Sequence, residues 1–337
     1  MLSIDKEVFN PSEGERLTMR FRLASLTESA KVSIKIFDFD QRLISSLCEE
    51  KLMAAGDHTI VWNGRDRDGR VVPDEAYFCT LEARQGPHRV VYDPTAVSGG
   101  VSHEIERVNI LAQTQQLEYT LPESGRVSIR AGIVDGPLLA VPVDWEPRVK
   151  GVHREHWDGM DQERLIPVLK HPRYQIRANY FTLPENTIIT RGNKATDYYR
   201  YRQSFTTPGL KKPQASPGPG SILSSPLFSK PIIFSKAPAI EVTFPQSQVE
   251  NGVPRLEKKF MVKTDFQEPW KAELRHLPYE IYFFLDGKYL IEIPVVKLPY
   301  EKLLEVGDQS PGFHVLTVNI KEIGGQIGIK STKVKLQ

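Results

Sequence analysis

The sequence has few cysteines, no long apolar run and almost no net charge, and each shortage excludes a class of protein. Only two cysteines, Cys48 and Cys79, occur in 337 residues, which excludes a small scaffold held together by disulfides. The two could pair only if their strands are neighbours, and we expect free, buried thiols instead. A reducing compartment fits this expectation, and an oxidising one stays open.

The chain also offers no sign of a membrane span or a nucleic-acid partner. No segment approaches the roughly 20 apolar residues that a spanning helix needs. With 44 basic against 42 acidic side chains, the net charge of +2 creates no field that would attract nucleic acid or anionic lipid. The first residues, MLSIDKEVFNPSEGERL, are acidic where a signal peptide would be basic and then apolar. Export by the usual signal is not expected, and the compartment stays open.

Catalytic motifs are missing as well. The sequence contains no nucleophile elbow with a Ser-His-Asp order, no phosphate-binding glycine loop and no Cys-x-x-Cys pair. The hydrophobic fraction of 40% and the charged fraction of 26% are those of a globular protein. We therefore expect two or three domains of roughly 100 residues each, without enzymatic activity and without a cofactor.

What the chain does have is an internal repeat. The segment AAGDHTIVWNGRD is echoed by VKGVHREHWDGMD, with glycines at 56 and 151, histidines at 58 and 153, and tryptophans at 62 and 157. Each pair is 95 positions apart. Upstream, the segment VSIK at 32–35 matches VSIR at 127–130 at the same separation. A duplicated module is predicted, of which the second copy is the more divergent.

Short strands with Gly and Asp turns fill both copies and the C-terminal region, for example KVSIKIFDFD, RVSIRAGIV and EIYFFLDGKYLIEIPVV. Such strands, about ten residues apart, are typical of antiparallel sandwiches. The predicted fold is all-β, with about three tandem immunoglobulin-like sandwiches joined by a proline-rich linker. The predicted divisions are 1–86, the second copy at 87–206, the linker at 207–238 and the last sandwich at 239–337. Asp286-Gly287 and Gly324-Gly325 predict two hairpins in the last region.

The linker contains an apolar stretch that would be costly to leave in water. We expect residues 222–236 to dock as an extended arm on a neighbouring surface. The side chains that we expect to carry this contact are Leu227, Phe228, Ile232, Ile233 and Phe234. A second candidate partner surface is the cluster DYYRYR at 197–202, with Tyr198, Tyr199 and Tyr201. We favour a protein contact, or packing over the second module, above stacking on nucleic-acid bases.

Several residues invite a chemical interpretation that we set against a structural one. Asp66-x-Asp68-Gly69 resembles a calcium loop, but position twelve is Tyr77 where a bidentate Glu is needed. We prefer a structural turn. His153, Glu155 and His156 suggest a metal site, yet in a strand the side chains of the two histidines point to opposite faces.

The two repeated tryptophans and the histidine pair His58 and His153 also allow a binding role or a structural one. Trp62 and Trp157 would be sugar-stacking platforms if exposed, but their equivalent positions before a tight turn favour packing on the core of each module. His153 aligns with His58, which has no second histidine near it in the sequence. We therefore expect both histidines to be structural, and we expect no metal site.

The first module resembles the immunoglobulin-like domain of the flagellar hook-capping protein family. The resemblance runs over residues 9–84, from Phe9-Asn10-Pro11 through VSIKIFD, IVWNGRD and GRVVP to Ala76-Tyr77-Phe78, and it is fainter over 108–182. Asp74-Glu75 stands where that family more often has Asp-Gly. The C-terminal region is similar to other bacterial immunoglobulin-like domains, from FLDG at 284–287 to GFHVLTV at 312–318. The resemblance implies a non-catalytic module that spaces or docks parts of a larger, extracytoplasmic or appendage-like assembly.

Three functions remain as hypotheses. The leading one is a structural or adaptor subunit of a larger bacterial assembly, whose partners are other protein subunits. The second is an accessory module that presents Trp and Tyr to glycans or another ligand. The third is an accessory subunit that holds an extracytoplasmic membrane or redox complex together.

Overall fold

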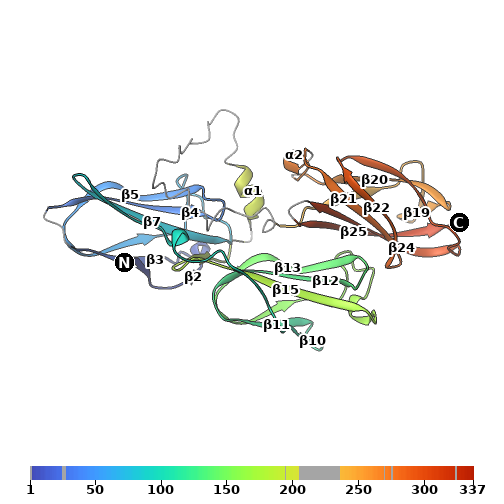
Figure 1. Ribbon diagram of the computed structural model, residues 1–337, viewed down its shortest axis with the longest axis horizontal. Helices are drawn as coiled ribbons and strands as arrows, with labels where there is room; N and C mark the ends of the chain where they lie inside the picture. The colour runs from blue at the N-terminus through green and yellow to red at the C-terminus, as the bar shows by residue number, and fades with distance from the viewer. Residues whose placement is uncertain are drawn as a thin grey trace.

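A computed structural model of the protein describes residues 2–24, 28–193, 195–204, 236–268, 270–274, 276–322 and 325–337. The described residues form three β-sandwiches with separate cores, linked in an extended arrangement (Figure 1). The predicted all-β class of immunoglobulin-like sandwiches is confirmed. Most of the predicted linker, including Leu227, Phe228, Ile232, Ile233 and Phe234, lies outside the described residues.

The first domain packs a small sheet, ordered β1-β3-β6, on a larger one, ordered β2-β16-β7-β4-β5 with β8 paired to β7. The strands are β1 Leu2–Ile4, β2 Val8–Phe9, β3 Leu17–Leu23, β4 Ala30–Asp38, β5 Leu43–Met53, β6 Gly56–Trp62, β7 Ala76–Gln85, β8 His88–Tyr92 and β16 Ile188–Thr190. Strand β3 shows why the sheets face one another: its apolar side chains alternate with Thr18, Arg20 and Arg22 and are all buried. This period of two places one apolar face against the core.

The second and third domains repeat this strand order. In the second, β10-β11-β14 packs on β13-β12-β15-β9, and in the third, β17-β20-β23 packs on β18-β19-β25-β24-β21-β22. The second domain has β9 Ser102–Glu104, β10 Asn109–Leu111, β11 Gln116–Leu121, β12 Gly125–Ile133, β13 Leu138–Arg148, β14 Gly151–His156 and β15 Tyr174–Thr182. The third has β17 Ile240–Thr243, β18 Gln248–Glu250, β19 Val253–Leu256, β20 Lys259–Phe266, β21 Tyr279–Leu285, β22 Lys288–Val296, β23 Tyr300–Glu305, β24 Gly312–Glu322 and β25 Ile327–Leu336.

One strand of the first domain comes from far along the chain. Strand β16 follows the second domain in sequence, yet it pairs antiparallel with β7 and parallel with β2. Ile188 and Ile189 are buried there. Residues 188–190 fall within the predicted division 87–206 of the second copy, but they lie in the larger sheet of the first domain. Among the described strands, two pairs are parallel and depart from the predicted antiparallel pattern, β16 with β2 and β19 with β25.

The three domains share one irregularity. In each, the strand at the edge of the larger sheet has a bulge, at Glu50 in β5, Trp145 in β13 and Val295 in β22, where φ is 44°, 53° and 54°. Glu50 and Trp145 are 95 positions apart, so the duplication extends to this detail. A bulge twists an edge and hinders its pairing with another strand.

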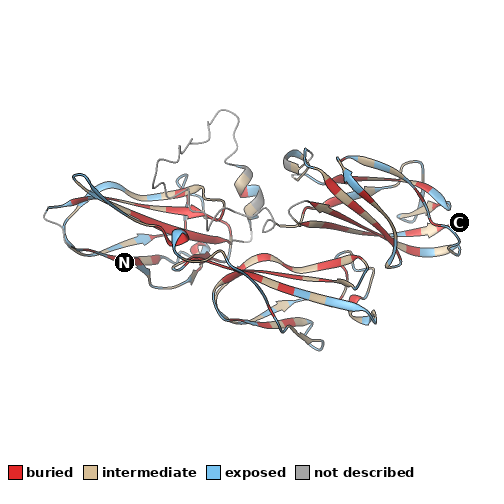
Figure 2. Cartoon of the chain, viewed as in Figure 1, coloured by how far each residue is buried: buried red, intermediate tan, exposed pale blue. Residues whose placement is uncertain are grey.

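The buried residues form stripes along the inner faces of the sheets in all three sandwiches (Figure 2). Cys48 lies on β5 and Cys79 on β7, on opposite sides of β4, and both thiols are free. Cys79 is buried as expected, whereas Cys48 is only half-buried. The predicted hairpins are present: Asp286 and Gly287 have positive φ between β21 and β22, and β24 pairs with β25. Gly324 itself lies outside the described residues.

Candidate functional site

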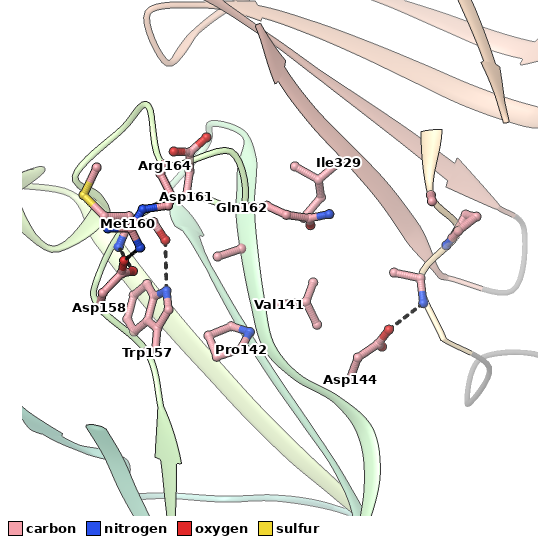
Figure 3. A pocket seen from close by; sticks show the side chains of 14 residues that line it. Val141, Pro142, Asp144, Trp157, Asp158, Met160, Asp161, Gln162, Arg164 and Ile329 are labelled. Atoms are coloured by element: carbon pink, nitrogen blue, oxygen red, sulfur yellow. Dashed lines mark hydrogen bonds and ion pairs between the residues drawn. The ribbon is translucent and has the colours of Figure 1, made fainter. Parts of the chain in front are cut away.

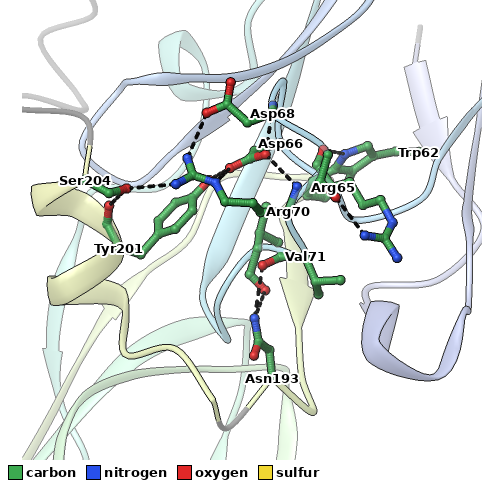
Figure 4. Close-up of polar contacts among 11 residues, drawn as sticks. Trp62, Arg65, Asp66, Asp68, Arg70, Val71, Asn193, Tyr201 and Ser204 are labelled. Atoms are coloured by element: carbon green, nitrogen blue, oxygen red, sulfur yellow. Dashed lines mark hydrogen bonds and ion pairs between the residues drawn. The ribbon is translucent and has the colours of Figure 1, made fainter. Parts of the chain in front are cut away.

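The tyrosine cluster predicted for partner binding forms a short helix, α1 (Tyr198–Gln203), which packs on the first domain (Figure 4). Tyr201 is 4% exposed, and its hydroxyl donates to Asp66 Oδ2 at 3.0 Å. The Arg70 side chain donates to the same oxygen at 2.9 Å, and its guanidinium carbon is 5.5 Å from the centre of the Tyr201 ring. Burial, and then the charge of Asp66, raises the pKa of Tyr201 well above its usual value, so the phenol stays a donor.

Helix α1 contacts a second carboxylate, that of Asp40, through a residue at each of its ends. The Tyr198 hydroxyl donates to Asp40 Oδ2 at 3.2 Å, Arg202 pairs with the same carboxylate at 3.4 Å, and Arg42 donates to the carbonyl oxygen of Arg202 at 2.8 Å. Asp38 is fully buried nearby, and burial, followed by the charge of Asp40, raises its pKa from 3.8 to about 7. Helix α1 thus covers carboxylates of the first domain.

This placement corrects one expectation, because the cluster packs on the first domain and not over the second. Tyr201 is enclosed within the chain, which leaves little of its surface for a partner. Tyr198 is half-buried, and the side chain of Tyr199 lies outside the described residues.

The two repeated tryptophans, for which sugar stacking was set against core packing, are packed in the cores of their domains. Trp62 is 1% exposed and Trp157 is 8% exposed. The indole nitrogen of each donates to a backbone carbonyl three residues later, at 3.0 Å and 2.9 Å. The predicted packing of both tryptophans on their own cores is confirmed.

Asp66 and the two repeated histidines likewise hold local structure. Asp66 Oδ1 accepts the backbone N–H groups of Asp68 and Arg70, both at 2.9 Å, which confirms the predicted turn. His58 and His153 each donate to the carbonyl oxygen four residues earlier and stack on an aromatic ring of the neighbouring strand. Among the described residues, no group of three or more His, Cys, Asp or Glu side chains is placed to hold a metal ion.

The junction between the first two domains is a small core of its own. Arg126 on β12 donates to Glu75 Oε1 at 2.9 Å and to the carbonyl oxygen of Trp145 at 2.8 Å, and its guanidinium lies 4.1 Å from the centre of the Phe39 ring. The side chains of Arg126 and Glu75 are only 4% and 2% exposed. Burial raises the pKa of Glu75, and the charge of Arg126 opposes that shift. A surrounding apolar cluster draws on both domains: Phe37, Phe39, Ala76, Phe78, Trp145, Phe181, Leu183 and Ile189.

The second and third domains meet through the edge strand β13. The Asn319 side chain on β24 accepts the backbone N–H of Leu138 at 2.8 Å and donates to its carbonyl oxygen at 2.9 Å. Lys330 on β25 pairs with Glu163 at 2.9 Å. One side chain therefore satisfies both outward-facing backbone groups of an edge residue, as a neighbouring strand would.

A cavity of about 440 Å³ lies beside this second junction (Figure 3). Its wall includes Trp157, Asp158, Gln162 and Arg164 from the turn after β14, with Asp144 across from them on β13. The Arg164 guanidinium pairs with Asp158, and the backbone N–H of Ala237 donates to Asp144 at 2.8 Å. Burial raises the pKa of Asp144. This volume falls within the range of small-ligand sites, which often occur at domain interfaces.

The cavity differs from the equivalent region of the first domain. There, Oδ2 of Asp66 is engaged by Tyr201 and Arg70, as Figure 4 shows. Asp161 stands at the equivalent position in the second domain and lines the cavity, and its Oδ2 has no hydrogen-bond partner within the described part of the chain.

In the part of the chain that is described, no helix has the length and hydropathy to cross a bilayer.

Comparison with known proteins does not assign the chain to a family. No family model matches the sequence, and no curated protein matches it. Among solved structures, the chain is similar to the soluble domain of PmoD from Methylocystis sp. ATCC 49242 (Rockwell), at 15% identity over 29% of this chain and 90% of that one, with a TM-score of 0.22.

Two other solved structures are adhesin segments. A tetra-tandem repeat in the extending region of a large adhesion protein is 11% identical over all of this chain and 73% of that one, with a TM-score of 0.21. A 1.5-MDa bacterial ice-binding adhesin is 10% identical over 100% of this chain and 97% of that one, with a TM-score of 0.20. Similarities with TM-scores this low do not indicate a function for the chain.

Proposed function

We propose that the chain is a non-catalytic structural or adaptor subunit of a larger bacterial assembly, in which it holds partner proteins at a fixed spacing. The observation that supports this most is the junction of the first two domains. A buried Arg126–Glu75 pair inside an apolar cluster has one good geometry, because each charge loses its partner if the domains move apart. Such a junction fits a rigid spacer better than a flexible tether.

The proposed contact with partners has two parts. The sandwich surfaces give the spacing, and the apolar arm at 222–236 docks on a neighbouring subunit. The arm is proposed from its sequence, since exposed Leu, Phe and Ile side chains are costly in water. At one edge of each larger sheet, a bulge at Glu50, Trp145 or Val295 hinders the addition of a partner's strand.

Native purification of the full chain, followed by mass spectrometry of what co-elutes, tests this function. Recovery in a stable complex of defined stoichiometry would support it, and recovery as a lone monomer would rule out an obligate subunit. Replacing Phe228, Ile233 and Phe234 together by serine should weaken the complex while leaving thermal unfolding unchanged. A matched change on exposed side chains outside the arm, Val97→Ser with Val101→Ser, should leave the complex intact. If the arm variant unfolds the isolated chain, the arm packs within it.

The cavity between the second and third domains favours a second candidate, a ligand-binding accessory module. The polar side chains that line it, among them Asp144, Asp158 and Gln162, suit the hydroxyl-rich surface of a glycan. A glycan array with the wild-type chain and with Gln162→Ala would test it. Binding of a defined glycan that the variant loses would support this candidate, and an empty array would remove it.

A further inference from the structure

One face of the third domain is covered by the second domain over only part of its area. On β24 and β25, Thr317, Asn319 and Ser331 are buried on the outer face of the larger sheet, where Asn319 meets Leu138. Alternate residues of a strand share a face, so Phe313 continues this face on β24 and Lys333 and Lys335 continue it on β25. Phe313 is 61% exposed. The covered surface thus runs directly into an uncovered one.

The uncovered part of this face consists of one aromatic ring and two lysines, Phe313, Lys333 and Lys335, and we call it the Phe313 patch. The Lys333 and Lys335 ammonium groups lie 4.3 Å and 5.7 Å from the centre of the Phe313 ring. Within the described residues neither lysine has a carboxylate at ion-pair distance, whereas Lys330 on the same strand pairs with Glu163. A large apolar ring therefore lies exposed to water next to two cations that have no acidic partner among the described residues.

The contacts between the second and third domains show what kind of group this sheet already binds. The second domain brings a hairpin tip and a carboxylate. A Cβ at Gly136 would lie 3.3 Å from the carbonyl oxygen of Gly287, so the two hairpin tips touch, and Glu163 pairs with Lys330 at 2.9 Å. Lys330 alternates with Ser331 and Lys333 and so starts from the other face of β25, yet it reaches an acid of the second domain. An acid–lysine pair thus already joins another domain to this sheet, and Lys333 and Lys335 are two further lysines for which the described residues provide no acid.

We infer that the Phe313 patch binds an acidic, extended protein segment of a partner subunit, with an apolar side chain on the Phe313 ring and carboxylates on Lys333 and Lys335. This inference rests on the proposed function and names the chemistry of one contact within it. Two cations are few for nucleic acid, whose binding depends on many phosphate contacts. A segment with two carboxylates spaced around one apolar residue satisfies both lysines and removes the ring from water.

The direct test uses the full chain and a fluorescein-labelled twelve-residue peptide of alternating leucine and glutamate, followed by fluorescence anisotropy. We expect saturable binding that weakens as salt rises, and that Lys333→Glu with Lys335→Glu reduces by about tenfold or more. Lys335→Glu alone, at one surface position, is the milder variant if the double change alters the thermal unfolding curve.

A matched control is available on the same sheet, because β22 also carries an exposed lysine, Lys288, and a large exposed ring, the 55% exposed Tyr289. Lys288→Glu with Tyr289→Ser should leave peptide binding unchanged. Equal losses in both variants, or no binding by the wild-type chain, would overturn the inference. Binding of a single-stranded oligonucleotide in place of the peptide, lost in the Lys333 and Lys335 variant, would also overturn it.

The outcomes separate this inference from the proposed function. A stable native complex together with no peptide binding would reject the Phe313 patch and leave the structural role standing. Recovery of a lone monomer would reject the structural role, whatever the peptide does.

Discussion

Replacing Arg126 by methionine should destabilise the first two domains more than any change of an exposed charge. The substitution leaves the Glu75 carboxylate buried without its cation and the carbonyl oxygen of Trp145 without the Arg126 donor. Removing one partner of a buried pair typically costs about 3–5 kcal/mol. We expect a loss of this size in the free energy of unfolding, since the side chains of Arg126 and Glu75 are 4% and 2% exposed.

Urea unfolding followed by tryptophan fluorescence measures this loss, because Trp62, Trp145 and Trp157 all lie in the first two domains. The double variant with Glu75→Gln should recover about 2 kcal/mol of it, since the uncompensated charge is then gone. Arg154→Met is the control: the Arg154 side chain is 61% exposed, and its ion pair with Glu118 at 2.8 Å should contribute about 1 kcal/mol or less. If Arg126→Met costs no more than this control, the pair does not hold the junction.

Three further changes have expected outcomes. The pKa of Asp38 is raised to about 7 in the native state, so the folded chain holds this proton where the unfolded chain has lost it. The free energy of unfolding should therefore fall by up to about 4 kcal/mol as the pH rises from 3.8 to 7, and Asp38→Asn should abolish that fall in urea titrations at a series of pH values. Equal slopes of unfolding free energy against pH in the two proteins would contradict this. Tyr201→Phe removes the hydroxyl that donates to Asp66 and should cost about 1–2 kcal/mol in thermal unfolding, whereas no change would mean that α1 is not docked. Asn319→Ala leaves both backbone groups of Leu138 unpaired and should loosen the third domain, which small-angle X-ray scattering would record as a changed maximum dimension; an unchanged scattering curve would refute it.

The repeat made much of the first two domains predictable. Trp62 and Trp157, with their matched histidines, occupy equivalent positions because each short sequence signal acts locally, within one turn and its two strands. The Asp286-Gly287 hairpin was predictable for the same reason, since the positive φ values it needs restrict the residue types.

Long-range placements could not be predicted in this way. Nothing in the letters Ile188-Ile189-Thr190 indicates that they pair with β7, because three apolar or β-branched residues fit any sheet. Helix α1 was missed for a related reason: its six residues are too few to show a helical period, and its docking depends on Asp40 and Asp66. The Phe313 patch depends on the register of β24 with β25, which composition alone does not reveal.

Strand β16 also sets an order of events during synthesis. The larger sheet of the first domain cannot be completed until residues 188–190 have left the ribosome, by which time the whole second domain has been made. A chain that ended at residue 86 would leave the open edge of β7 and the buried ring of Tyr77 without the strand that covers them. The N-terminal sandwich is therefore the earlier one in sequence but the later one to be finished, and the two domains should mature as a single unit.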